Sequence, residues 1–276
     1  MIGTNWLSNL KKFDRARFVS LRHLNSERRK EIAAIYSFNL ELANIAWNVS
    51  EPELGYLKLR WWEDYINEIN DAHSSGENEY LIILSKLVAE GKLHRSNLLR
   101  LIKAREFDCS KKPFDSLEQQ IKYLRDTSQN LLFMGLSCLI EFNDNSLRRN
   151  LSEYFGLSLG LARFVLAVGS LRQNKCYSLF LPTRLDYSTY FEGRINDNIV
   201  ERIRSDIDLT FNLYNTGKRE LKSMGLKKRS LSVLNTVNNL VPILKEIKNN
   251  PQINFRKDHK LSFRAKFIGK INELVT

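Results

Sequence analysis

The stretch YSFNLELANI, residues 36–45, decides the fold class, because its polar and apolar residues recur at the spacing of an α-helix. The polar stripe that runs through it consists of Ser37, Glu41, Asn44 and Asn48. The apolar stripe consists of Ile35, Phe38, Leu42, Ile45 and Val49. The stretch therefore predicts an amphipathic helix whose polar stripe faces either water or an internal cavity.

The rest of the chain has the same helical periodicity. Only 12 Gly and 5 Pro interrupt its 276 residues, and no run alternates convincingly at the period of two that is typical of a strand. The predicted helices cover residues 26–49, 56–69, 80–90, 95–107, 114–142, 147–172, 197–223, 229–248 and 259–275. Ser26 is the predicted cap of the first helix, and Pro52 can open the second. These patterns predict an all-α fold in a single domain, residues 1–276.

Two of these segments are apolar nearly all round, residues 131–140 and 157–169, and we expect them to form the buried centre. No stretch reaches the roughly 18 apolar residues of a membrane span, so none is predicted. The start of the chain lacks the long apolar core of a signal peptide. The three cysteines are isolated, which predicts neither a zinc site nor disulfides and fits a reducing, cytoplasmic compartment.

The chain is strongly basic, with a formal net charge of +12. Such a charge favours anionic partners, namely nucleic acid, anionic lipid or phosphorylated substrates. No nucleic-acid-binding motif accompanies the charge, so we do not expect a nucleic-acid partner. Residues 256–275 combine an apolar side with several Lys and Arg, which leaves two readings open. In the first, the segment lies on an anionic membrane surface, such as that of the inner membrane. In the second, it packs on the domain.

Two segments carry a resemblance to a known family. The sequence RRKEIAAIYSFNLELANIAWNVSEPELGYLKLRWWEDYINEI, residues 28–69, resembles the opening of the squalene/phytoene synthase family. The sequence LSLGLARFVLAVGSLR, residues 157–172, followed by LFLP at 179–182, is similar to its second signature. The resemblance implies an isoprenoid synthase-like helical bundle around a central cavity. It also implies head-to-head joining of two prenyl diphosphates, with two aspartate clusters that hold Mg²⁺.

The chain departs from that family pattern at both clusters. The positions that match the first cluster are Ala43, Asn44 and Trp47, and none of these is acidic. The second cluster normally follows Leu171 and Arg172, where this chain continues with Gln173, Asn174, Lys175 and Cys176. Each missing carboxylate removes a hard oxygen ligand and a charge from a Mg²⁺ site. We therefore predict no metal site and no cofactor, and assign no catalytic residue.

Within the family, the runs YSFNLELANI, VSEPELG and WWEDYINEI resemble the mitochondrial complex I assembly factor six subgroup. This resemblance implies a non-catalytic, membrane-peripheral factor that acts in assembly or binds lipid, with respiratory complex I subunits and a prenyl diphosphate or lipid as possible partners. The alternative is an active Mg²⁺-dependent prenyltransferase with unconventional ligands. The missing acids weigh against this alternative.

Seven residues are candidates for a remnant cavity or substrate-binding site. They are Tyr36, Glu41, Asn44, Trp47, Tyr123, Arg163 and Arg172. Arg163 interrupts an apolar helix, so we expect it to pair with an internal acid such as Glu141 or to bind a diphosphate. Arg172 can also cap the end of its helix. Arg105 and Asp108 are three residues apart, and we expect an ordinary surface ion pair.

Overall fold

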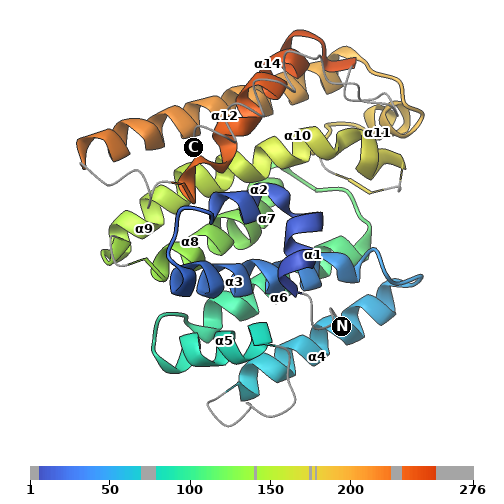
Figure 1. Ribbon diagram of the computed structural model, residues 1–276. Coiled ribbons are helices and arrows are strands. Elements are labelled where there is room, and N and C mark those ends of the chain that lie inside the picture. Colours follow the sequence, from blue (N-terminus) through green and yellow to red (C-terminus); the bar gives the residue numbers. More distant parts are fainter. Residues whose placement is uncertain are drawn as a thin grey trace.

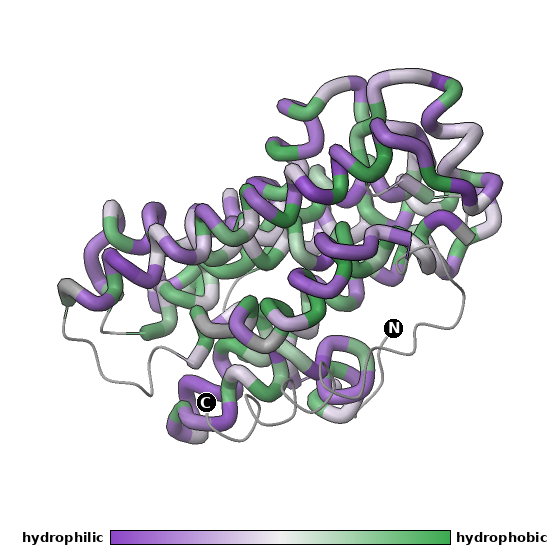
Figure 2. Tube along the Cα trace, turned by 90° about the horizontal axis from the view of Figure 1, so that it is seen from above, coloured by the Kyte–Doolittle hydropathy of each residue, from purple (hydrophilic) through white to green (hydrophobic). Residues whose placement is uncertain are grey.

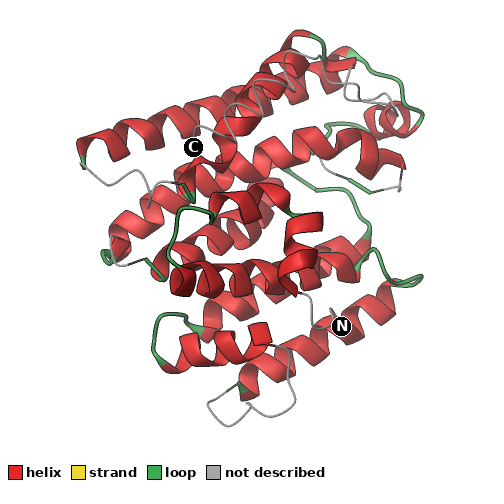
Figure 3. Cartoon of the chain, viewed as in Figure 1, coloured by secondary structure: helices red, strands yellow, loops and turns green. Residues whose placement is uncertain are grey.

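The structure is a computed structural model that describes residues 6–69, 79–139, 142–173, 176–177, 179–224 and 232–252. Within these ranges every regular element is helical and there is no strand (Figure 3). The all-α prediction is therefore confirmed. The predicted helix at 259–275, and with it the basic amphipathic segment 256–275, lies outside the described residues.

The predicted helices occur in the expected order with altered boundaries, and the structure adds three that were not predicted, two within residues 6–20 and one at 184–191. The first eight are α1 (Trp6–Phe13), α2 (Arg15–Ser20), α3 (Ser26–Ile45), α4 (Pro52–Glu68), α5 (Glu79–Ala89), α6 (Arg95–Ser110), α7 (Leu117–Leu124) and α8 (Asn130–Ser137). The others are α9 (Asn145–Leu151), α10 (Ser158–Gln173), α11 (Arg184–Phe191), α12 (Asp197–Ser223) and α14 (Val241–Asn249). Two π-helical turns, η1 (Arg125–Gln129) and η3 (Ser152–Leu157), and a 3₁₀ segment, η4 (Leu234–Leu240), lie between them.

Helix α3 crosses the middle of the molecule, with α4 and α5 below it and α10, α12 and α14 above it in Figure 1. It packs against α1, α5, α6 and α8, so most of its circumference is buried. Ser37, the first residue of the polar stripe, is buried. Asn25, and not Ser26, caps the helix, because its side-chain oxygen accepts the Arg28 amide at 2.9 Å. The helix ends at Ile45, earlier than predicted, and the other three stripe residues, Glu41, Asn44 and Asn48, are not buried.

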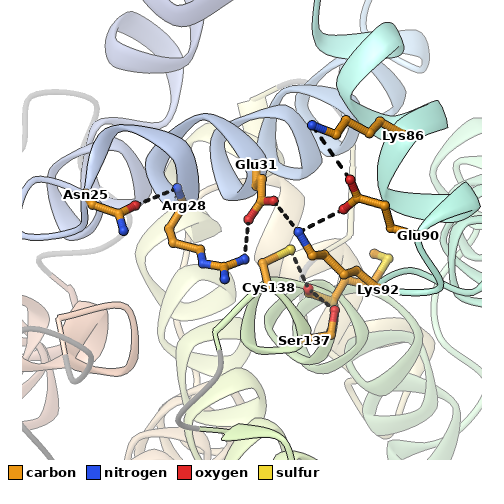
Figure 4. A network of polar contacts seen from close by, with 9 residues as sticks. Asn25, Arg28, Glu31, Lys86, Glu90, Lys92, Ser137 and Cys138 are labelled. Carbon is orange, nitrogen blue, oxygen red and sulfur yellow. Dashed lines mark hydrogen bonds and ion pairs between the residues drawn. The ribbon is translucent and has the colours of Figure 1, made fainter.

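A half-buried ionic network fixes the start of α3 (Figure 4). The buried carboxylate of Glu31 accepts from Arg28 Nη1 at 3.0 Å and from Lys92 Nζ at 2.7 Å. Lys92 also contacts Glu90 at 2.8 Å. The hydrogen bonds that Lys92 donates to Glu31 and Glu90 raise its pKa above the usual value, which keeps it charged. The network joins α3 to the segment that follows α5.

The two long predicted helices are each interrupted by a π-helical turn, and these turns pack against each other. An added Cβ at Gly156 would lie 2.6 Å from the Gln129 Cα, so the two backbones are in direct contact. At Gly160 an added Cβ would lie 2.9 Å from Leu124 and Ser128 side-chain atoms. Glycine is required at Gly156 because any side chain would push η1 and η3 apart.

The continuous helical run Asn145–Arg172 has the length and composition of a membrane span, but 61% of its most apolar window is buried among other helices. It is the central helix that its composition predicts. Apolar residues of α10 and α12 form one core, including Val165, Val168, Ile203 and Ile207. In Figure 2, hydrophobic and hydrophilic residues alternate at short intervals along the outer helices, as expected for amphipathic helices around such a core.

Candidate functional site

The C-terminal half of α3 separates two cavities. One, the α3–α4 groove, has a volume of about 360 Å³ and is lined by Glu41, Asn44, Ile45, Asn48, Lys58, Trp61 and Trp62. The other, which we call the Arg105 cavity, has a volume of about 160 Å³ and receives residues from α3, α6, α7 and α10. The predicted polar stripe therefore faces a groove, while Trp47 and Tyr123 lie in the other cavity.

Aromatic rings make up much of the wall of the Arg105 cavity. Phe107 stacks on Phe114 with a centroid distance of 4.4 Å, and Tyr123 stacks on Phe164 at 5.7 Å. Trp47 lines the same cavity and is 48% exposed, so it stands at the mouth and does not fill the interior. An apolar wall of this kind suits a hydrocarbon chain or an aromatic ring.

A hydrogen-bonded network centred on Arg105 forms the polar wall. Arg105 Nη1 donates to Asp108 Oδ2 at 2.9 Å and to the Tyr123 hydroxyl at 2.8 Å. Its Nη2 donates to Asn39 Oδ1 at 2.8 Å, and the Tyr123 hydroxyl donates to Asp108 Oδ1 at 2.7 Å. The prediction of an ordinary surface ion pair is wrong, because the guanidinium is largely buried and bonded to α3 and α7 as well.

Burial and the neighbouring charges shift the pKa values of both Arg105 and Tyr123. Burial alone would lower the pKa of Arg105, but Coulombic interaction with Tyr123 and Asp108, together with their hydrogen bonds, raises it above its usual range. Burial raises the pKa of Tyr123 strongly, so its hydroxyl stays neutral and keeps its proton. The Arg105 Nε atom is buried and meets no acceptor among the described residues. The wall therefore holds a permanent cation with one donor still to be satisfied.

The charges around the Arg105 cavity favour an anion. Lys111 and Lys112 line it together with Arg105, and Asp108 is the one carboxylate among the described lining residues. Lys111 adopts a left-handed conformation, with φ of 49°, at the point where α6 ends. The chain turns there, and both lysines remain beside the cavity.

The donor atoms in this cavity do not suit Mg²⁺. Of the three positions that match the first aspartate cluster, Ala43 and Trp47 line the Arg105 cavity, whereas Asn44 lines the α3–α4 groove. Asp108 is already bonded to Arg105 and Tyr123. Mg²⁺ needs accessible oxygen ligands, preferably carboxylates. Among the described residues no group of three His, Cys, Asp or Glu side chains could hold a metal.

Tyr36 and Arg163 belong to a partly buried cluster around Asp14 that lines neither cavity. Arg163 Nη2 contacts Asp14 Oδ1 at 2.5 Å, and Arg17 Nη1 contacts Asp14 Oδ2 at 2.6 Å. The guanidinium of Arg17 lies 5.6 Å from the centre of the Tyr36 ring. Arg163 therefore has an internal acid as predicted, but the acid is Asp14. Glu141 lies outside the described residues.

Burial raises the pKa of Tyr36 to about 12, so its hydroxyl is neutral at physiological pH. Arg172 donates from Nη1 to the Phe191 carbonyl oxygen at 3.2 Å. It thus joins the end of α10 to the end of α11, as a residue that positions these helices. Of the seven predicted residues, the structure brings only Trp47 and Tyr123 together in the Arg105 cavity.

Sequence reasoning missed Arg105, Asp108 and Lys111 as cavity residues. An Arg and an Asp three residues apart look the same on an exposed and on a buried helix face. Their environment depends on Asn39 and Tyr123, which lie 66 and 18 residues away from Arg105 in the chain. The neighbouring Phe107 and Phe114 were the one sequence signal that this face is partly apolar.

Comparison with known proteins gives one family match. The profile of the family described as squalene/phytoene synthase matches residues 10–265. The chain is also 27% identical over 133 residues to bovine NADH dehydrogenase (ubiquinone) complex I, assembly factor 6. It is 26% identical over 136 residues to the human protein of that name. Each alignment covers 48% of this chain and 40% of the relative, so less than half the length of these curated relatives is matched.

Solved structures share the fold at low sequence identity. The squalene synthase HpnC from Alicyclobacillus acidocaldarius superposes with a TM-score of 0.72 at 18% identity, covering 88% of this chain and 92% of that one. A dehydrosqualene synthase in complex with ligand gives 0.74 at 14% identity, covering 98% and 94%. YisP from Bacillus subtilis gives 0.64 at 15%, covering 96% and 93%. The isoprenoid synthase-like fold is therefore confirmed.

Proposed function

Since the chain belongs to the squalene/phytoene synthase family, we propose that it is a non-catalytic member which holds one anionic isoprenoid or related lipid in the Arg105 cavity. The observation that carries this proposal is the buried, hydrogen-bonded guanidinium of Arg105 beside an aromatic wall. A phosphate or diphosphate group would lie beside the charged wall that Arg105, Lys111 and Lys112 form. The hydrocarbon part would pack against the phenylalanine rings.

The size of the cavity supports binding without condensation. Its volume of about 160 Å³ lies below the roughly 300–1,000 Å³ of ordinary ligand pockets. Such a space accommodates a headgroup and the first part of one chain, but not two prenyl diphosphates. The direct contact of η1 with η3 at Gly156 leaves no room for a chain between those two turns. On this proposal both aspartate clusters are lost, and no step of catalysis passes through Mg²⁺.

The biological role that we propose is assembly of respiratory complex I. This part rests on sequence similarity to complex I assembly factor 6, over about half of the chain. The proposed location is cytoplasmic and peripheral at the inner membrane, where a lipid ligand and complex I subunits would both be within reach. The ligand-bound dehydrosqualene synthase among the structural neighbours is consistent with a lipid ligand.

The second candidate function is an active Mg²⁺-dependent prenyltransferase. It is favoured by the fold, which the chain shares with squalene and dehydrosqualene synthases over most of its length. The donor set weighs against it, because Ala43 and Trp47 supply no carboxylate and Asp108 is engaged by Arg105.

Binding of farnesyl diphosphate in EDTA, measured by calorimetry, tests the proposed function. The native protein is expected to bind without metal. Arg105→Met should weaken binding by about 10- to 100-fold, because a charge-assisted hydrogen bond contributes about 1.5–3 kcal/mol. Arg105→Lys keeps the charge and should recover part of the affinity.

The matched control is Arg219→Met, at an exposed position on α12, which should bind like the native protein. Thermal melts establish that each variant is folded. If a folded Arg105→Met protein binds as tightly as the native protein, or if binding requires Mg²⁺, the proposal is wrong.

A further inference from the structure

Large exposed apolar side chains gather around the connection between α3 and α4. Nine such residues occur in the described chain, and five of them lie between positions 47 and 61. These five are Trp47, Leu54, Tyr56, Leu57 and Trp61. Single exposed apolar residues are ordinary, but a local concentration of them marks an interaction surface.

Leu54, Leu57 and Trp61 form a stripe on one side of α4, because they are spaced by three and four residues. The opposite side of the helix, with Leu59, Trp62 and Ile66, is buried. Leu57 is 67% exposed and Trp61 is 51% exposed. Among the described residues, nothing covers this outward apolar stripe, while the other face of the helix is in the core.

Two neighbouring aromatic rings fix the position of the Trp61 side chain. Its ring stacks on Tyr65 at 5.7 Å and meets the edge of Trp62 at 4.9 Å. Beside it opens the α3–α4 groove, where Trp61 and Trp62 face the polar residues Glu41 and Asn44. A rigid tryptophan next to a groove is typical of residues that dominate binding energy at protein interfaces.

The charge of the outward face of α4 indicates which kind of partner would bind there. Although the whole chain carries +12, α4 contains four acids and only two bases, Lys58 and Arg60. Asp64 and Glu68 continue the stripe of Leu57 and Trp61 at helical spacing. Arg60 lies 3.7 Å from Glu63 and 3.5 Å from Asp64, so it offsets part of this charge. The excess of acids on α4 favours a cationic protein segment over an anionic bilayer at this surface.

We infer that the outward face of α4, together with the α3–α4 groove, docks a basic amphipathic helix of a partner protein. The apolar side of that helix would cover Leu54, Leu57 and Trp61. Its Lys or Arg side chains would lie against Asp64 and Glu68, at the end of α4 remote from Lys58. This is the helix-in-groove mode of recognition. The inference rests on the proposed role as an assembly factor, for which it supplies the partner surface.

The test uses a defined probe and the full chain. A labelled peptide of about 18 residues, with leucine at i, i+3, i+4 and i+7 and lysine elsewhere, is titrated by fluorescence anisotropy. The same peptide with glutamate in place of lysine is the charge control. The lysine peptide is expected to bind, and the glutamate peptide to bind at least about tenfold more weakly. Trp61→Ala and Leu57→Ala should each weaken the lysine peptide by about tenfold or more.

Two further variants test the role of charge and provide a control for the loss of an exposed apolar side chain. Asp64→Lys combined with Glu68→Lys should weaken the lysine peptide and strengthen the glutamate peptide. Leu185→Ala removes a side chain that is 74% exposed on α11 and should change nothing. Trp61, Leu57 and Leu185 are exposed, so folding is expected to survive, and circular dichroism verifies it.

Several outcomes would overturn the inference. One is binding of the lysine peptide that is insensitive to Trp61→Ala and Leu57→Ala. Another is Trp61-dependent binding to phosphatidylglycerol vesicles instead of the peptide, which would assign the face to a bilayer. A homodimer that Trp61→Ala dissociates would assign it to a second copy of the chain. Arg105→Met should leave peptide binding unchanged, so failure of the lipid proposal and failure of this one are distinguishable.

Discussion

At the scale of single residues, two of the charged networks that the structure describes each contain an arginine that the sequence analysis singled out. Arg105, Asp108 and Tyr123 form the polar wall of the cavity. Asp14 lies between Arg17 and Arg163, away from both cavities. An apolar helix that contains an arginine therefore does not by itself identify a binding site. The arginine next to an open cavity is the better candidate, because a ligand can reach it.

Asp14 should make stability depend on pH at the acid end. Burial by itself would raise the pKa of its carboxyl, but Arg17 and Arg163 outweigh burial and hold that pKa well below its usual range. The folded pKa is thus below the unfolded value near 4. The stabilisation is complete above about pH 4 and is lost as the pH falls below it towards the folded pKa.

Urea unfolding at several pH values measures this effect. Asp14→Asn should lower the free energy of unfolding by about 3–5 kcal/mol near pH 7, because it leaves the buried Arg17 guanidinium without a charged partner. Below about pH 4 the difference between variant and native protein should shrink. Asp197→Asn, at an exposed site on α12, should cost less than about 1 kcal/mol. An unchanged difference from pH 7 to pH 2 would contradict this account.

At the scale of helices, sequence periodicity predicts where helices occur and in what order. It predicts the geometry inside each helix less well. Helix α12 was predicted at 197–223 and is found there, and Pro52 does open α4. The predicted helices 114–142 and 147–172 lacked their π-helical turns, because a single such turn leaves the surrounding helical pattern of apolar residues intact. Gly156 was visible in the sequence, but the partner it approaches, Gln129, is set by the tertiary fold.

The contact between η1 and η3 can be tested with alanine substitutions at two glycines. Gly156→Ala should destabilise the protein by about 1–3 kcal/mol, because the new Cβ would overlap the Gln129 backbone. Gly135→Ala is the matched control in α8, where a Cβ would meet its nearest neighbours at an ordinary 3.5 Å. It should be neutral or stabilise by up to about 1 kcal/mol. Urea midpoints compare the two, and equal effects would contradict the close packing at Gly156.

At the scale of the whole molecule, one helix serves two surfaces. The end of α3 presents Glu41 and Asn44 to the α3–α4 groove, and the turn that follows it presents Trp47 to the Arg105 cavity. The sequence predicted the stripe and the fold, but not that the two sides of α3 would face different cavities. That division depends on where α4 and α6 pack, and the packing depends on contacts between distant residues such as Gly55 and Cys109. We propose a lipid ligand for one side and a partner helix for the other.

The measurement that tests the central claim most directly is turnover. Purified, folded protein is mixed with farnesyl or geranylgeranyl diphosphate and Mg²⁺, with and without NADPH. Products are identified by mass spectrometry and pyrophosphate release is followed in parallel. The account predicts no head-to-head hydrocarbon and no pyrophosphate release, although farnesyl diphosphate binds in EDTA. A head-to-head hydrocarbon from the native protein would contradict it, and would mean that residues other than two aspartate clusters support the reaction.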